Sequence, residues 1–267
     1  MKKELLLNLL KNKQYRQLHT LLNQNNTTDI ACLLEQLDIK DCALVFRLIP
    51  KKKAAQVFVN FNHCTQKQLV EMFSEKELID VIENQYMDDL VDIIEELPAN
   101  LVMRILNHID QNQRETINQL LSYPKDSAGS IMTTEFISLK KEYTIGEALE
   151  YIKKNGISSK TIYTSYVVQN KELLGVVSTK DLLLSDENKK ITEIMNKNNQ
   201  YVYTHTDQEA VIEIFRKYDL MVLPVLDDEM MMVGIVTFDD VMDVMVDETT
   251  EDIEKMSAVE PNDQSYF

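Results

Sequence analysis

Acidic residues are concentrated in residues 237–252, whose sequence is TFDDVMDVMVDETTED. The stretch holds seven acidic residues and no basic one, and its acids alternate with Val and Met as on a packed helix. Asp240 and Asp243 are three positions apart and would share one helix face, and Glu248 and Glu251 repeat that spacing. Carboxylate oxygens without His or Cys beside them are hard ligands that suit Mg²⁺ or Ca²⁺ better than Zn²⁺. The stretch therefore predicts binding of a hard divalent cation.

A second acidic pair lies far from the first along the chain. Asp88 and Asp92 are four positions apart in MDDLVD, which also places them on one helix face. No D-x-D-x-D-G loop occurs, so an EF-hand is excluded, and few carboxylates with several retained waters are typical of Mg²⁺ sites. A structural alternative stays open for each acid, because such a pair is commonly a solvated helix face. Asp207 and Glu209 would cap a helix, and Asp219 would close one.

The composition of the whole chain also favours a positively charged partner. Its 267 residues carry a formal net charge of −16, which repels nucleic acid and attracts cations or basic partners. The length indicates two or three domains. The three cysteines show no CxxC spacing, which favours a reduced, cytosolic compartment over disulfides or zinc. No apolar run is long enough to span a bilayer, so we expect no membrane-crossing segment.

The first half of the chain is predicted to be entirely helical. Residues 1–124 contain no glycine, and Leu, Ile and Val recur at spacings of three and four. The segment Val45–Phe61 resembles Ile93–Ile109, and Pro50 and Pro98 occupy matching positions. Proline is tolerated in the first turn of a helix but not inside one, so each segment is interpreted as two helices that meet at the proline. Repeated helical hairpins of this kind stack into an α-solenoid.

The second half is a tandem repeat with an offset of about sixty residues, read directly from the sequence. SIMTTEFISL corresponds to EIMNKNNQYVY, TIGEALEYIKK to TDQEAVIEIFRK, SYVV to LPVL, and GVVSTKDL to GIVTFDDV. Thr144 with Glu147, and Thr206 with Glu209, have the T-x-x-E spacing of a capping box. Each repeat therefore predicts the order strand, helix, strand, strand, helix.

Each repeat carries a G-h-h-[S/T]-x-x-D motif, in which h is apolar. The motif residues are Gly175, Ser178 and Asp181 in the first repeat and Gly234, Thr237 and Asp240 in the second. On these residues the second half resembles a tandem pair of CBS domains, a Bateman module. A helical repeat domain followed by this pair and by the acidic stretch is similar to the cytosolic part of MgtE-type magnesium transporters. The segments SAGSIMT, YDLMVLPV, GIVTFDDVMDV and TTEDIEKM carry the likeness, which covers essentially the whole chain.

The resemblance implies a multi-domain fold. An all-α, superhelical (armadillo-like) N-terminal domain is expected at residues 1–124, followed by an α/β tandem CBS module with domains at 125–191 and 192–250. Residues 251–267 would begin the linker helix toward a membrane pore domain of the same full-length protein, which this sequence lacks. The family is dimeric through its CBS domains, so the resemblance implies a homodimer at the cytoplasmic face of the cell membrane.

The resemblance also implies a function and a ligand set. Mg²⁺ would bridge acidic clusters between the N-terminal domain and the CBS pair, and toward the pore, and would close the dimer when intracellular Mg²⁺ is high. The positions carried over as Mg²⁺ ligands, directly or through water, are Asp88, Asp92, Asp207, Glu209, Asp219, Asp240, Asp243, Glu248, Glu251 and Asp252. One position departs from the family: Gln56 stands where the family can place an acid, so a contact there is weaker or missing.

Two other functions remain open. CBS pairs often bind ATP or AMP, and Ser178, Asp181, Thr237 and Asp240 supply the hydroxyl and carboxylate groups for phosphate and ribose. The alternative is therefore an adenine-nucleotide sensor, with ATP also kept as a modulator beside Mg²⁺. A helical-repeat interaction scaffold is the other alternative. An enzyme is not expected, because the four histidines are dispersed and no nucleophile–base pattern, P-loop or dinucleotide fingerprint occurs.

Overall fold

The computed structural model describes residues 3–256, apart from the side chains at positions 247, 251, 252 and 254–256. The chain divides into two compact units. The first comprises Met1–Gln85 and Asp89–Ile117, and the second comprises Tyr86–Asp88 and Asn118–Phe267. The short segment Tyr86–Asp88 thus packs as part of the second unit.

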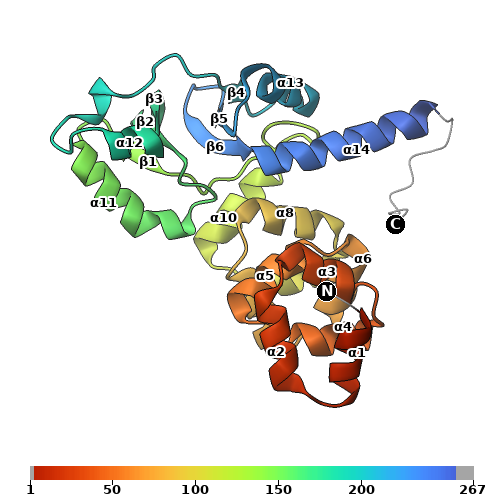
Figure 1. The fold of residues 1–267 in the computed structure, drawn as a ribbon. Helices are drawn as coiled ribbons and strands as arrows, with labels where there is room; N and C mark the ends of the chain where they lie inside the picture. The colour runs from red at the N-terminus through yellow and green to blue at the C-terminus, as the bar shows by residue number, and fades with distance from the viewer. Residues whose placement is uncertain (1–2, 257–267) are drawn as a thin grey trace. The chain divides into compact units, whose positions relative to one another are not determined.

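The first unit is built from helices, as the absence of glycine and the apolar spacing predict (Figure 1). The described helices are α1 (Lys3–Lys11), α2 (Tyr15–Gln24), α3 (Thr27–Leu34), α4 (Ile39–Phe46), α5 (Lys51–Val59), α6 (His63–Met72), α7 (Glu75–Ile82), α8 (Met87–Glu96), α9 (Ala99–Leu106) and α10 (Gln111–Leu120). Pro50 and Pro98 stand directly before α5 and α9. This position confirms the two proline-initiated helices predicted from the internal repeat.

Helices of the first unit stack on alternate neighbours. α3 packs on α5, α5 on α7 and α7 on α9, while α4 packs on α6. This order is the pattern of stacked helical hairpins and confirms the predicted helical-repeat architecture. At its centre the rings of Phe46, Phe58, Phe61 and Phe73 contact one another, with centroids 5.4 to 6.5 Å apart. All four side chains are buried, so they form the continuous core that such a stack requires.

The second unit contains two copies of the predicted order of strands and helices. The first copy has β1 (Ser138–Lys140), α11 (Ile145–Asn155), β2 (Thr164–Gln169), β3 (Glu172–Ser178) and α12 (Thr179–Leu184). The second copy has β4 (Val202–Tyr203), α13 (Gln208–Tyr218), β5 (Val222–Leu226), β6 (Met232–Thr237) and α14 (Phe238–Met256). In each copy the first strand is parallel to the second and the second is antiparallel to the third.

The two repeats exchange their leading segments. Thr133, at the start of the first repeat, pairs with Ile235 of β6, and Asn196, at the start of the second, pairs with Val176 of β3. The glycine of each motif lies beneath the exchanged segment. A Cβ atom at Gly234 would lie 2.8 Å from a carbonyl oxygen of that segment, and the same distance applies at Gly175. The glycines of the two motifs therefore permit close backbone approach between the repeats.

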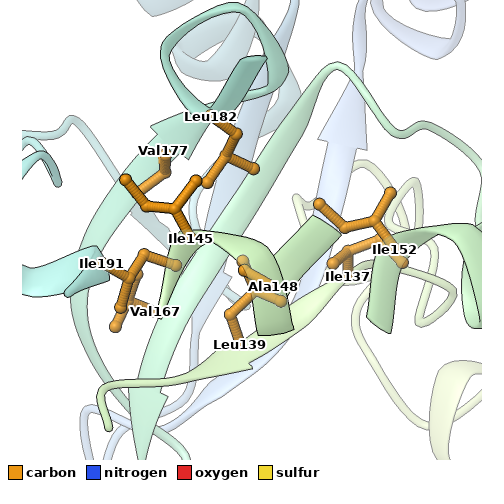
Figure 2. Close-up of a cluster of buried hydrophobic side chains, with 9 residues drawn as sticks. All are labelled: Ile137, Leu139, Ile145, Ala148, Ile152, Val167, Val177, Leu182 and Ile191. Atoms are coloured by element: carbon orange, nitrogen blue, oxygen red, sulfur yellow. The ribbon is translucent and has the colours of Figure 1, made fainter. Parts of the chain in front are cut away.

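The core of the first repeat lies between its sheet and its helices. Figure 2 shows nine buried apolar side chains that converge there from β1 and the residue before it, β2, β3, α11, α12 and the segment before the second repeat. They are Ile137, Leu139, Ile145, Ala148, Ile152, Val167, Val177, Leu182 and Ile191. Leu139, Val167 and Val177 supply the strand side chains of this core, as expected of a sheet covered on this face.

Helix initiation in the two repeats follows the prediction once and departs from it once. Thr144 and Glu147 form the predicted capping box at the start of α11. The prediction for Thr206 and Glu209 is wrong, because Asp207 is the N-cap of α13 and accepts a hydrogen bond from the Glu209 amide at 2.9 Å. The Thr206 hydroxyl instead accepts from the amide of Tyr203 at 3.0 Å. A carboxylate one position later is an equally good cap, and it displaced the threonine.

The last described helix, α14, contains residues 238–252 of the acidic stretch. It runs for 19 residues, from Phe238 to Met256 (Figure 1). Val241 and Val244 are buried, whereas Met242, Asp243 and Val246 are exposed. None of the helices in the described part of the chain combines the length and the apolar character needed to cross a membrane.

Candidate functional site

A lysine lies between two of the predicted ligands within the second unit. The Lys160 ammonium nitrogen is 2.7 Å from Oδ2 of Asp88 and 3.5 Å from Oδ1 of Asp240. The three side chains are 10%, 6% and 20% exposed, so the pairs are largely removed from solvent. The same ammonium lies 5.3 Å from the centre of the Tyr86 ring. Asp88 and Asp240 are thus brought together, as the prediction of a shared site requires, but around a cation that belongs to the chain.

Backbone hydrogen bonds fix the position of this lysine and of Asp88. The Lys160 amide donates to the carbonyl oxygen of Glu135 at 2.8 Å. The Glu135 carboxylate accepts from the amide of Met87, with distances of 3.2 and 3.3 Å, and from the Thr133 hydroxyl at 2.7 Å. Met87 is the first residue of α8, and Asp88 follows it. A half-buried carboxylate therefore binds the free amide of a helix start, an arrangement that the helix dipole favours.

The electrostatics of this cluster are dominated by burial. Burial raises the pKa of Asp240 to about 6; Lys160 acts to lower it, and the Asp88 carboxylate acts to raise it. Burial also raises the pKa of Glu135, and Asp88 adds to that effect. Oδ1 of Asp88 is buried and has no hydrogen-bond partner among the described residues. A single ammonium thus faces three carboxylates, and the cluster retains an excess of negative charge.

A second group of predicted ligands lies where α13 begins. Asp207 and Glu209 are exposed at the N-terminus of that helix. Between them, the Gln208 side chain donates to Oε1 of Glu248 on α14 at 2.6 Å. Gln208 therefore ties Glu248 to the helix start that Asp207 and Glu209 flank. The helix-capping alternative is confirmed for Asp207, which leaves one of its oxygens engaged with the backbone.

The remaining predicted ligands are dispersed. Asp219 closes α13 in a left-handed conformation with φ of 49°, which confirms its structural alternative. Asp92 on α8 and Asp243 on α14 are exposed, and Gln56 is exposed on α5. Glu251 and Asp252 lie outside the residues whose side chains are described. Across the side chains that are described, no three His, Cys, Asp or Glu residues gather as a metal ion would require.

The two nucleotide-motif pairs share a contact between the hydroxyl and the carboxylate. In the first repeat the Ser178 hydroxyl is 2.6 Å from the Asp181 carboxylate and caps α12 by accepting from the Asp181 amide at 3.1 Å. In the second repeat the Thr237 hydroxyl is 2.5 Å from the Asp240 carboxylate. Both motifs therefore form a local turn at a helix start. The Thr237 residue is 5% exposed, and its hydroxyl is already bonded within the chain.

Sequence reasoning missed Lys160, Glu135 and Tyr86. Lys160 lies in SSKTIY, in the loop between α11 and β2, and nothing in its neighbourhood distinguishes it from the other lysines. Glu135 precedes a strand in TTEFISL, where an acid is unremarkable. Only the exchange of leading segments between the repeats brings residue 135 close to the motif of the second repeat.

Comparison with known families identifies a helical domain followed by two repeats, although its N-domain match includes residues 86–88 and 118–126 of the second unit. The model of the MgtE intracellular N domain matches residues 25–126. The model of the CBS domain matches twice, at residues 128–187 and 191–247.

Individual relatives agree with both matches. The chain is 35% identical over 256 residues to the "Magnesium transporter MgtE" of Thermus thermophilus, an alignment that covers 94% of this chain and 57% of that protein. It therefore spans a little over half the length of that relative. The solved cytosolic domain of the Mg²⁺ channel MgtE in complex with ATP superposes with a TM-score of 0.86 at 33% identity, over 91% of this chain and 100% of that one. The solved soluble part of a magnesium transporter superposes with a TM-score of 0.85 at 30% identity, over 92% and 97% of the two chains. The chain belongs to the MgtE family, of which it carries the N domain and the CBS pair.

Proposed function

We propose that this chain is the intracellular Mg²⁺-sensing part of an MgtE-type magnesium transporter or channel. The observation that carries the proposal is its likeness, over nearly its whole length, to a solved domain described as the cytosolic domain of a Mg²⁺ channel. The net charge of −16 and the paired acids on helix faces supply hard oxygen ligands for the sensed ion. Transport itself belongs to a pore domain elsewhere in the full-length protein.

The sensing mechanism follows from charge repulsion. Two unit charges about 4 Å apart repel by roughly 1 kcal/mol in bulk water and roughly 4 kcal/mol at an intermediate effective dielectric. Without Mg²⁺, acidic residues of the helical domain and of the CBS pair would drive the two apart. Mg²⁺ bound by carboxylates from both, directly or through water, would bring them together, and this closure would be transmitted to the pore.

The size of the required switch explains why the chain carries many acids. Moving an equilibrium from 1:99 to 99:1 needs roughly 5.5 kcal/mol of differential binding. A weak site at ten times its dissociation constant supplies only about 1.4 kcal/mol. About four such sites are therefore needed for each switching unit. The ten candidate ligands named from the sequence are the pool from which these sites would be drawn.

The assembly that this function requires is part of the proposal. Exposed apolar side chains on α14 support a homodimer through the CBS pair: Met242, Met245 and Val246 are 41%, 39% and 61% exposed. Residues 1–124, 125–191 and 192–250 would be the functional domains, with the linker helix toward the pore beginning at 251. The dimer would lie at the cytoplasmic face of the cell membrane, joined to the pore domain of the same protein.

Small-angle scattering tests the switch. The radius of gyration should fall when EDTA is replaced by about 10 mM Mg²⁺, a concentration chosen to saturate weak sites for a hard cation. NaCl at the same ionic strength is the control, because screening alone also weakens repulsion. Equal radii in EDTA and Mg²⁺, or equal compaction by NaCl, would reject the proposal.

A matched pair of variants on α8 tests which acids take part. Asp92 is a cleaner probe than Asp88, because removing Asp88 also breaks a buried ion pair. Asp92→Asn should weaken the Mg²⁺-dependent protection of residues 123–130 from protease, whereas Glu95→Gln, also exposed on α8, should not. Superimposable protection curves for the two variants would remove Asp92 from the ligand set.

Nucleotide binding is the second candidate function. The observation that favours it is the solved relative described as a complex with ATP, together with the hydroxyl–carboxylate pairs in both CBS motifs. ATP without Mg²⁺ should then protect the CBS pair from protease at micromolar concentration. The Asp181→Ala variant should lose this protection and keep the response to Mg²⁺. If neither ligand protects the chain and a partner protein stays bound in EDTA, the interaction scaffold is favoured instead.

A further inference from the structure

The strongest unexplained feature of the second unit is the burial of Lys160 among carboxylates. Lysine carries a strongly hydrated charge and is seldom buried without paired acids. Here its side chain is only 10% exposed, and its ammonium contacts Asp88 at 2.7 Å and Asp240 at 3.5 Å. Asp88, at 6% exposure, is the most deeply buried of the three side chains. The lysine therefore neutralises charges that are largely removed from water.

A divalent ion and this ammonium cannot both occupy the space between the two carboxylates. Mg²⁺ binds carboxylate oxygens at about 2.0–2.1 Å and retains several waters. The ion and its waters would need the volume that the ammonium fills. Like charges at such a distance also repel strongly in a buried site. Oδ1 of Asp88 has no hydrogen-bond partner among the described residues, so the lysine pairs with only one of the two oxygens of this carboxylate. The cluster is therefore suited to a cation and already holds one.

We propose that Lys160 is a tethered cation that takes the place of a divalent ion between Asp88 and Asp240. It holds Asp88, which belongs to the second unit, at its place in that unit whether or not Mg²⁺ is present. This proposal deepens the proposed function. Only the part that concerns Mg²⁺ sensing rests on that function; the role of Lys160 does not. If Mg²⁺ is sensed, the exposed acids sense it, and the Asp88–Asp240 position contributes a permanent contact instead of a switched one.

The Met87 amide offers a direct measurement of that contact. It donates to the half-buried Glu135 carboxylate, so it exchanges with solvent deuterium only when Met87 separates from Glu135. Exchange at Met87 would be followed in the whole chain, in EDTA and in about 10 mM Mg²⁺. In the parent protein it should be slow and equal in both. Lys160→Met keeps the apolar stem and removes the charge; Lys153→Met, at an exposed lysine on α11, is the matched control.

The proposal predicts a charge-specific loss and a specific rescue. In EDTA, Lys160→Met should speed exchange at Met87 by at least about tenfold, because it leaves buried carboxylates without their counter-ion. Mg²⁺ should restore slow exchange, and calorimetry should find one more bound ion per chain than in the parent. The double variant Lys160→Met with Asp88→Asn should exchange more slowly in EDTA than the single variant and should bind no extra ion. Lys153→Met should behave as the parent.

The opposite results are equally distinct. Slow exchange of Lys160→Met in EDTA, or fast exchange that Mg²⁺ does not reverse, would overturn the tethered cation; the second result would show that the lysine acts through packing. A failure of the proposed sensing function looks different. In that case the parent shows no compaction with Mg²⁺, while Lys160→Met still loses and regains protection at Met87.

Discussion

Replacing Asp240 by Asn should stabilise the second unit at neutral pH, by an amount that depends on pH. Burial raises the pKa of Asp240 from its usual 3.8 to about 6, even with Lys160 nearby. The folded protein therefore holds this proton more tightly than the unfolded chain does. The contribution of Asp240 to stability is present at low pH and is lost as the pH rises toward 6 and beyond.

The magnitude follows from the size of the shift. At about 1.4 kcal/mol for each pKa unit, ionised Asp240 costs the folded state roughly 3 kcal/mol at pH 7.5 and about half of that at pH 5. Asn has nearly the same shape, cannot ionise, and keeps an acceptor for the Thr237 hydroxyl. Because the pKa of about 6 already includes the attraction to Lys160, the cost of roughly 3 kcal/mol is the upper bound, and we expect a net gain of about 1–3 kcal/mol at pH 7.5 that shrinks at pH 5.

Native-state hydrogen exchange at the β5–β6 amides measures this difference in the intact chain. EDTA is present throughout, so that bound ions do not contribute. Amides of α4, in the first unit, serve as the internal control. A variant that equals the parent at pH 7.5, or a stability difference that does not change between pH 5 and pH 7.5, would refute the reasoning that burial dominates at Asp240.

Three further predictions concern packing, a surface ion pair and assembly. Gly234→Ala should destabilise the second unit by about 1–3 kcal/mol, because the new Cβ would meet a carbonyl oxygen at 2.8 Å; Gly146→Ala, where the nearest atom is at 3.4 Å, is the control, and denaturation of both is compared. Arg47 holds the pKa of Glu77 at about 2, so Glu77→Gln should lower the stability of the first unit at pH 7 by no more than about 1 kcal/mol. The parent should lose that difference as the pH falls from about 4.5 to 2, which acid titration of the first-unit amides checks. Val246→Lys should shift the proposed dimer to monomer in analytical ultracentrifugation, and an unchanged dimer would exclude α14 from the interface.

The fold was predictable from the sequence because its signals are local and repeated. Three features can be read along the chain: the glycine-free apolar spacing, the two prolines and the offset of about sixty residues. The structure confirms the helices and the repeats that they predict. Periodicity of this kind can be recognised in the sequence without knowledge of tertiary contacts. The error at Thr206 has the same origin, because two good caps stood side by side and only backbone geometry decides between them.

The candidate site was predictable only in its chemistry. The family resemblance implies that Asp88 and Asp240 both bind a cation, and the structure brings them to one ammonium. The sequence could not identify Lys160, because its ion pair with Asp88 joins residues 72 positions apart and produces no periodic pattern. The burial of Asp88 was equally hidden: the pattern MDDLVD fits a solvated face, but its first acid is buried and the exposed side begins with later residues.

Burial divides the acids of this chain into two groups with different physical roles. Asp88, Glu135 and Asp240 are largely buried, and their counter-ion is covalently part of the chain, so its local concentration cannot change with that of Mg²⁺. Asp207, Glu209 and Asp243 are exposed, so dissolved cations can reach them. A sensor needs the second kind, because only a counter-ion that exchanges with solution reports its concentration. The acidic stretch on α14 can pack because Val241 and Val244 are buried while Asp243 is exposed. The dense acidic stretch is thus compatible with a packed helix, and it leaves the charge where a dissolved ion can meet it.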